Sequence, residues 1–244
     1  MFSIISQLKE YPRLAMLAVI AFLIAIIFAI VLHEMAHGWV AYWNGDNTAK
    51  MRGRLSLNPL KHIDPIGMLL MLLVGFGWAK PVPIDPRNFR DYKKGMITVS
   101  LAGVIANFIM AFLSACFLAI IVACTKNVDL NIYVGQEITA TQYTYFFFSY
   151  LFRFGITFNL TLMAFNLLPI YPLDGFRVVE TLAKPNNKYV EFMYKYGNFA
   201  LLGFLLLSSL LGQISPYLDI FGMYISAVNN AVSKLFTLMF GVAI

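Results

Sequence analysis

The chain has 244 residues, of which 60% are apolar and only 12% are charged, and its net charge is +6. A mean hydropathy of +0.73 excludes a soluble domain with one anchor and predicts an all-α polytopic protein of the cell membrane. The Lys and Arg residues lie in loops beside apolar segments, where anionic lipid headgroups are the simpler partner. We therefore expect the lipid bilayer, and not nucleic acid, to be the partner of this charge.

Apolar stretches predict about five to six membrane segments. In chain order they run from Leu14 to Tyr42, Ile66 to Trp78, Met96 to Cys124, Phe154 to Ile170, Phe199 to Leu211 and Tyr217 to Ile244. We interpret residues 1–244 as a single domain, with a core at about 14–180 and additional C-terminal helices at about 197–244.

The Ile66 to Trp78 stretch has 13 residues and three glycines, whereas a spanning helix needs roughly 20 residues. A short re-entrant or β-type membrane-associated element fits it better. On either side, Arg52–Leu57 alternates polar and apolar residues and Ala79–Ile84 carries two prolines. These segments predict a small surface sheet, to which another chain could add as a strand, although two plain loops are the alternative.

Loop charge predicts the orientation of the chain in the membrane. The loops on both sides of the short stretch are rich in Lys and Arg, so we expect them to be cytoplasmic; these residues are Lys50, Arg52, Arg54, Lys61, Lys80, Arg87, Arg90, Lys93 and Lys94. The Thr125 to Gln142 connection has one Lys against two acidic residues and is expected outside. The Lys184 to Lys195 loop then returns to the cytoplasm.

The sequence HEMAH stands at residues 33–37, at the end of the first apolar run. On a helix, His33 and His37 project from one face at the spacing that zinc prefers, and Glu34 can take a proton from water there. Ionisable groups are costly in a membrane, so we interpret these three as functional. They lie about 29 to 35 Å along a helix that starts at Leu14, near the cytoplasmic edge of the hydrocarbon.

A catalytic zinc needs a third protein ligand, and the chain lacks the extended motifs of soluble metalloproteases. The best candidate is Asp174, which we expect at the cytoplasmic end of the helix that starts near Phe154. Pro169 and Pro172 would break this helix, and Gly175 would permit a tight turn. A solvated Asp in a helix-ending turn is the alternative.

With HEMAH at 33–37 and NLLPIYPLDG at 166–175, the chain resembles the site-2 protease family of intramembrane zinc metalloproteases. The segment SLAGVIAN at 100–107 is similar to a third family element, with Val104 in place of its usual Pro. The resemblance covers about residues 28–180 and, with GWAKPVPI at 77–84, favours the compact prokaryotic branch without PDZ or CBS domains. It implies one zinc ion per chain, held by His33, His37 and Asp174, with Glu34 as general base.

Three further polar residues have open roles at this stage. Asn107 could donate a hydrogen bond to the oxyanion of the transition state, or it could bridge two membrane helices. Asn166 could have either of these roles, or it could satisfy backbone groups freed by Pro169. His62 is expected in a loop or behind the metal ligands.

The expected function is an intramembrane zinc endopeptidase that cuts other proteins in or near their transmembrane segments. A zinc transporter is an alternative, but it would need polar residues along a path through the membrane, and these helices contain few. A scaffold without activity is the other alternative, although every catalytic position is filled.

Overall fold

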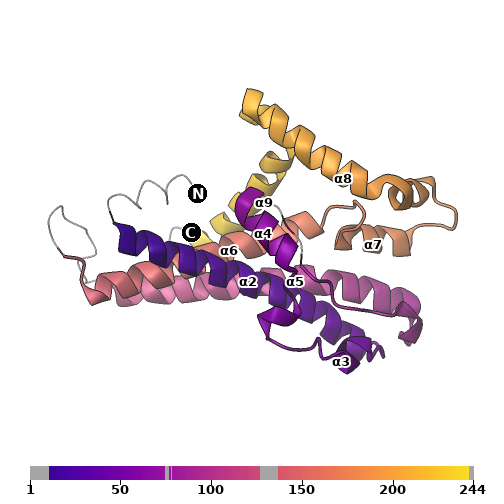
Figure 1. Cartoon of the computed structure of the whole chain (residues 1–244), viewed down its shortest axis with the longest axis horizontal. Coiled ribbons are helices and arrows are strands. Elements are labelled where there is room, and N and C mark those ends of the chain that lie inside the picture. Colours follow the sequence, from indigo (N-terminus) through magenta and orange to yellow (C-terminus); the bar gives the residue numbers. More distant parts are fainter. Residues whose placement is uncertain (1–10, 75–76, 78, 127–136, 242–244) are drawn as a thin grey trace.

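The computed structural model describes residues 11–74, 77, 79–126 and 137–241, and these ranges are mainly helical (Figure 1). The α-helices are α2 (Pro12–Trp43), α3 (Thr48–Met51), α4 (Pro65–Val74), α5 (Tyr92–Cys124), α6 (Ala140–Asn166), α7 (Asp174–Leu182), α8 (Lys188–Ile214) and α9 (Ile220–Phe240). Short 3-10 turns lie at η1 (Pro59–Lys61), η2 (Pro86–Asn88) and η3 (Pro216–Leu218).

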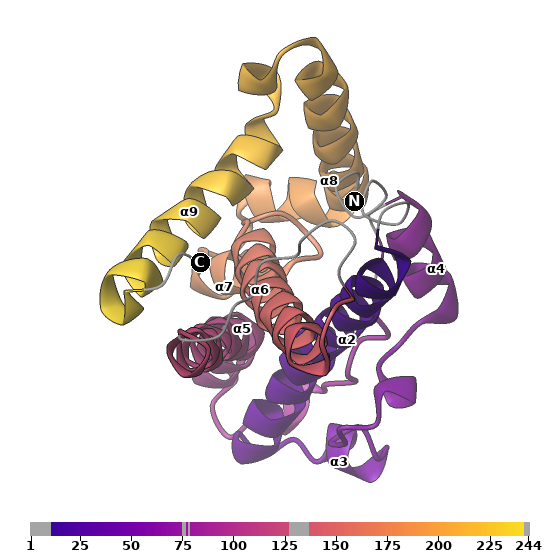
Figure 2. The ribbon, with the colours of Figure 1, turned by 90° about the vertical axis from the view of Figure 1, so that its left-hand side faces the viewer.

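The centre of the molecule is a bundle of α2, α5 and α6, which lie side by side (Figures 1 and 2). Small residues let the helix backbones approach closely, as is usual between membrane helices. The buried small residues of α2 and α5 include Ala15, Ala18, Ala21, Ala25, Ala29, Ala102, Gly103, Ala111 and Ala115. This close approach is what allows side chains of all three helices to meet around the end of α2.

Four described helices, α2, α5, α6 and α8, are long and apolar enough to cross a membrane. The short helix α7 packs on α5, while α9 packs against α6 and α5. Figure 2 shows α8 and α9 diverging from the turn that joins them, above the central bundle. The expected all-α membrane architecture is thus confirmed in its coarse form. Helices α4 and α9 are not among the four that are long and apolar enough to cross a membrane.

Helix α6 begins at Ala140, well before the Phe154 expected from hydropathy. A capping box explains the early start: the Thr139 hydroxyl accepts from the Gln142 N–H, and the Gln142 side chain accepts from the Thr139 N–H. The aromatic run that follows is therefore helical. Helix α5 runs without interruption through Val104, where the family element usually has Pro.

The loop after α2 is anchored by Asp46, which is completely buried. Its carboxylate accepts from the N–H of Thr48 at 3.0 Å, from the N–H of Asp85 at 2.8 Å and from Asn88 Nδ2 at 2.8 Å. Such charge-assisted bonds are stronger than neutral ones. They fix the segment before α5 to the end of α2, beside the HEMAH residues.

The expected sheet between Arg52–Leu57 and Ala79–Ile84 is wrong. Neither segment forms a strand in the described ranges, and Ala79 instead makes an isolated antiparallel bridge with Ile63. The two segments meet through a side chain: Arg54 Nη2 donates to the carbonyl oxygens of Lys80 and Pro81 at 2.6 and 3.2 Å. The alternation of polar and apolar residues did not predict the backbone of Arg52–Leu57, which begins in a turn: Arg52 has φ −85° and ψ 8°, and Gly53 has φ +62°.

Candidate metal centre

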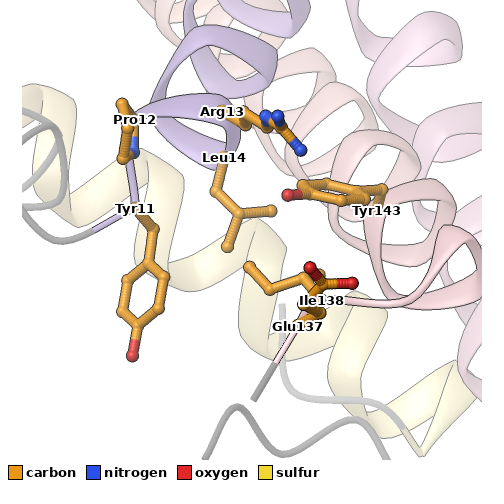
Figure 3. Close-up of a pocket in the computed structure, with 7 residues that line it drawn as sticks. All are labelled: Tyr11, Pro12, Arg13, Leu14, Glu137, Ile138 and Tyr143. Atoms are coloured by element: carbon orange, nitrogen blue, oxygen red, sulfur yellow. The ribbon is translucent and has the colours of Figure 1, made fainter. Parts of the chain in front are cut away.

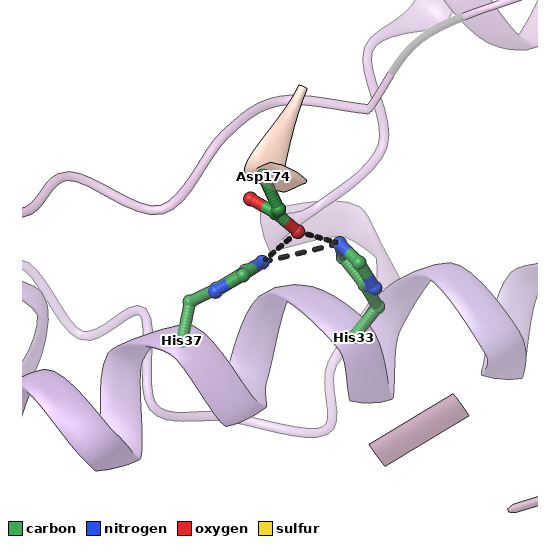
Figure 4. A group of neighbouring side chains, drawn as sticks. All are labelled: His33, His37 and Asp174. Carbon is green, nitrogen blue, oxygen red and sulfur yellow. Dashed lines mark hydrogen bonds and ion pairs between the residues drawn. The ribbon is translucent and has the colours of Figure 1, made fainter. Parts of the chain in front are cut away.

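His33, His37 and Asp174 meet at the junction of α2 and α7 (Figure 4). The two imidazoles project from one face of α2, and both are buried. Their Nε2 atoms lie 3.1 Å apart, and Asp174 Oδ2 lies 3.3 Å from that of His33 and 3.2 Å from that of His37. The structure therefore brings together the three residues that the sequence suggested as ligands.

Asp174 reaches this point by a route that differs from the expected one. Helix α6 ends at Asn166, and after a break Asp174 is the first residue of α7, not the end of α6. A Cβ on Gly175 would lie 2.6 Å from the carbonyl oxygen of Leu168. Gly175 is thus required because two backbones approach closely, and not because of a left-handed turn, since its φ is outside the positive range.

The Nδ1 atom of each imidazole, on the rear side of the ring away from Asp174, makes a hydrogen bond. His37 Nδ1 lies 2.7 Å from the carbonyl oxygen of Val99, and His33 Nδ1 lies 2.6 Å from Asn107 Oδ1. Asn107 Nδ2 donates to Asn159 Oδ1 at 2.8 Å, and Asn159 Nδ2 donates to the carbonyl oxygen of Gly155 at 2.7 Å. Because that carbonyl only accepts, the amide orientations are fixed, and each imidazole carries its proton on Nδ1.

These assignments leave three lone-pair atoms facing one another: the two Nε2 atoms and Asp174 Oδ2, which is buried and has no hydrogen-bond partner. Three acceptors at such short separations repel unless a cation lies among them. Nitrogen from two His and oxygen from one carboxylate form a donor set typical of catalytic zinc, with hydrogen-bonded rear nitrogens that hold the rings in place. The residues present fit a zinc ion.

Gly103 was missed by sequence reasoning, although it lies in the SLAGVIAN element. A Cβ at this position would lie 2.6 Å from His33 Nδ1 and 2.6 Å from His37 Nε2. Only glycine leaves room for both rings against α5. The sequence holds no signal that this glycine faces the two histidines, because that depends on how α2 and α5 pack.

Residues 90–207 match the family model of Peptidase family M50. The chain is also 36% identical over 217 residues to "Putative zinc metalloprotease YwhC" of Bacillus subtilis, which covers 89% of this chain and 91% of that protein. The chain belongs to peptidase family M50. The M50 peptidase is 27% identical over 192 residues to "Putative zinc metalloprotease Rip2" of Mycolicibacterium smegmatis, covering 77% of this chain and 66% of that protein. No solved structure matches.

Membership confirms the resemblance to the site-2 protease family, and with it a zinc metalloprotease activity. The four long apolar helices make the M50 peptidase a multi-pass membrane protein. The family match contains α5, α6, α7 and most of α8, and therefore includes Asp174, whereas the HEMAH histidines precede it.

Glu34 of the M50 peptidase is half-buried and lies beside the three candidate ligands. Its Oε2 accepts a hydrogen bond from the N–H of Val82 at 2.8 Å. A cavity of about 180 Å³ adjoins it; the lining residues include His33, Glu34, His37, Pro81, Val82, Ile84, Asn166, Asp174 and Arg177. An attacking water and a peptide group could approach Glu34 and the ligands through this space.

Asn107 does not line this cavity, and it is completely buried behind His33. Both hydrogens of its amide point away from the ligands, toward Asn159 Oδ1 and, at 3.4 Å, the Ala29 carbonyl. These contacts favour the alternative of an Asn that bridges membrane helices, and the oxyanion contact stays a prediction. Its oxygen also holds the His33 ring.

The other two polar residues with open roles lie apart from the three ligand atoms. His62 is completely buried, and its Nε2 lies 2.8 Å from the carbonyl oxygen of Ser56. Asn166 lines the cavity, but its amide donates to the Leu162 carbonyl within α6 at 3.0 Å. Neither joins the metal-ligand group found among the described residues.

A larger hollow of about 370 Å³ lies at the opposite end of α2 (Figure 3). Arg13 and Glu137 are its charged residues, and Tyr11 and Tyr143 are its aromatic ones. The 20 residues from Arg13 to His33 correspond to about 30 Å of helix, so this hollow is separate from the metal centre. It lacks a group of metal ligands in the described residues.

Proposed function

We propose that this zinc metalloprotease is an intramembrane endopeptidase that cuts other membrane proteins in or near their transmembrane segments. The observation that carries the proposal is that the two His ligands and Glu34 lie on α2, which is long and apolar enough to cross a membrane, and meet Asp174 at the start of α7. Such a place is reached most directly by a substrate that is itself in the membrane. The partners are therefore a transmembrane protein substrate and the lipid bilayer.

In this proposal His33, His37 and Asp174 hold one zinc ion, and Glu34 is the general base. Zinc, when bound, supplies a Lewis acid that polarises the scissile carbonyl and lowers the pKa of water. Glu34 takes the proton of the attacking water and returns it to the leaving amine. The Val82 N–H fixes one oxygen of the Glu34 carboxylate, which leaves the other for this proton. Asn107 holds the His33 ring from behind.

The membrane arrangement follows from the same sequence arguments. We place the active site near the cytoplasmic side, because the flanking loops are rich in Lys and Arg. Residues 1–244 form a single domain in this proposal. Helix α9 of 21 residues would be a fifth membrane segment, and the 10-residue α4 would be the short membrane-associated element.

The proposal is tested by expressing the wild type and two variants in bacterial cells, and comparing membrane-protein fragments and zinc content. Glu34→Gln should keep zinc and lose cleavage, because an amide cannot take the proton. Asp174→Ala should lose most of the zinc, since two His make an incomplete site. The matched control is Glu191→Gln, an exposed glutamate of α8, which should cleave like the wild type.

Cleavage by Glu34→Gln at the wild-type rate would exclude Glu34 as general base. Unchanged zinc content in Asp174→Ala would mean that another residue supplies the third ligand. If the wild type yields only fragments of soluble proteins, the intramembrane substrate class is wrong although the protease remains.

A further inference from the structure

The segment Ala79–Ile84, which we call the strap, is fixed from both sides. The N–H of Lys80 donates to the carbonyl oxygen of His62 at 2.8 Å, and the N–H of Val82 donates to Glu34 Oε2 at 2.8 Å. Pro81 and Pro83 have no N–H. Only Ala79 and Ile84 thus keep a donor for any further partner, so the expected free edge for substrate strands is largely occupied within the protein.

Arg54 holds the strap at the peptide groups next to Val82. A single nitrogen, Nη2, donates to the Lys80 carbonyl at 2.6 Å and to the Pro81 carbonyl at 3.2 Å. The carbonyl of Pro81 and the N–H of Val82 belong to one planar peptide group. Fixing that carbonyl therefore fixes the direction in which the Val82 N–H points, and this direction is toward Glu34.

The cost of this arrangement argues against a merely structural role. Arg54 is only 9% exposed, its Nε is buried without a hydrogen-bond partner, and no carboxylate of the described residues forms an ion pair with it. A buried charge without a direct counterion destabilises a fold. Burial lowers the pKa of the guanidinium, and the attraction of the nearby Glu34 carboxylate opposes this.

The packing around Gly38 places the two segments on the same part of α2. A Cβ on Gly38 would lie 2.6 Å from Leu55 Cδ2 and 3.2 Å from Val82 Cγ1. Leu55 follows Arg54, and Gly38 follows the ligand His37. The Arg54 segment and the strap therefore meet on α2 beside the candidate catalytic residues.

We propose that Arg54 is a positioning residue for the general base: by holding the Pro81 carbonyl, it keeps the Val82 N–H on Glu34. The inference rests on the proposed function, in which Glu34 is that base. A carboxylate held at one oxygen has fewer orientations to search, and loss of orientation at a reacting group lowers the rate more than it weakens substrate binding.

The first test compares full-length, zinc-loaded Arg54→Gln with the wild type, with the exposed Arg52→Gln as matched control. Hydrogen exchange resolved at the Val82 amide reports this contact, and it should be about 10-fold faster in Arg54→Gln. With a substrate identified by the co-expression experiment, kcat should fall about 10- to 100-fold with KM and zinc content little changed. Arg52→Gln should match the wild type in every measurement.

Two further variants separate positioning from general stability. Arg54→Lys should recover much of the lost kcat, because one ammonium can replace the one nitrogen that makes both bonds. Val82→Pro removes the N–H itself and should lower kcat, provided that zinc content shows an intact site. Adding Arg54→Gln to Val82→Pro should then cost little more, since both changes remove the same contact.

Several results would overturn the inference. Faster cleavage by Arg54→Gln would mean that the strap blocks the site and Arg54 keeps it closed. A raised KM with unchanged kcat would make Arg54 a substrate contact, and losses that multiply in the double variant would make the two contacts independent. If the wild type cleaves no membrane protein, the proposed function fails; unchanged exchange at Val82 in Arg54→Gln then refutes the contact on its own.

Discussion

The substitution Gly103→Ala should weaken zinc binding although it replaces none of the three candidate ligands. The new methyl would lie 2.6 Å from His33 Nδ1 and from His37 Nε2, whereas ordinary contact begins at 3.4 Å. The rings must therefore yield by at least the 0.8 Å between these values. Zinc sites tolerate deviations of only about 0.2 Å in their ligand distances.

The expected loss of zinc affinity can be judged from substitutions that disturb the groups behind metal ligands. Loss of a partner behind a metal ligand weakens binding by about 10- to 100-fold. Gly103→Ala displaces both histidines at once, so we expect zinc affinity to fall by about 100-fold or more. The fold itself should lose about 1–3 kcal/mol through overpacking, which the three-helix core can absorb.

The assay is a zinc titration of purified protein in detergent against a competing chelator, with helix content measured in parallel. Gly203→Ala is the matched control, because no heavy atom lies within 4 Å of a Cβ at that position. It should bind zinc normally and gain roughly 0.5–1 kcal/mol of helix stability. Unchanged zinc affinity in Gly103→Ala would refute the geometry of the metal centre.

Three further predictions address the surroundings of the site. Asn107→Ala should weaken zinc binding about 10- to 100-fold by releasing His33, whereas Asn107→Asp, which keeps the acceptor, should weaken it less. Burial acts to raise the pKa of Asp46, but the hydrogen bonds to its carboxylate outweigh this effect and hold the pKa below its ordinary value. Asp46→Asn should therefore lower the free energy of unfolding by about 2 kcal/mol at neutral pH. This contribution should persist down to about pH 4 and disappear as acid protonates the wild-type carboxylate, which unfolding followed at several pH values would reveal. In a background without native cysteines, cysteine at Lys184 should react only with reagent on the cytoplasmic side and cysteine at Glu137 only from outside; the reverse pattern would overturn the orientation.

The sequence predicted the residues that form the candidate metal centre better than it predicted the helix boundaries and loop contacts around them. His33 and His37 share a face because the helix has a fixed period, and Asp174 follows from the need for a third ligand. Hydropathy missed the start of α6, because a capping box and not apolarity begins that helix. The strap was read as a sheet edge because local periodicity does not show that Arg54 and Glu34 reach it from distant parts of the chain.

The hydrogen bonds behind the histidines end at groups that do not ionise. His37 leads to the Val99 carbonyl, and His33 leads through Asn107 and Asn159 to the Gly155 carbonyl. Neither route can accept and pass on a proton, because amides and carbonyls keep their protonation state at physiological pH. Among the described residues, neither chain of hydrogen bonds behind the histidines offers protons a way out, so the cavity beside Glu34 is the exit that this geometry provides for protons handled during hydrolysis.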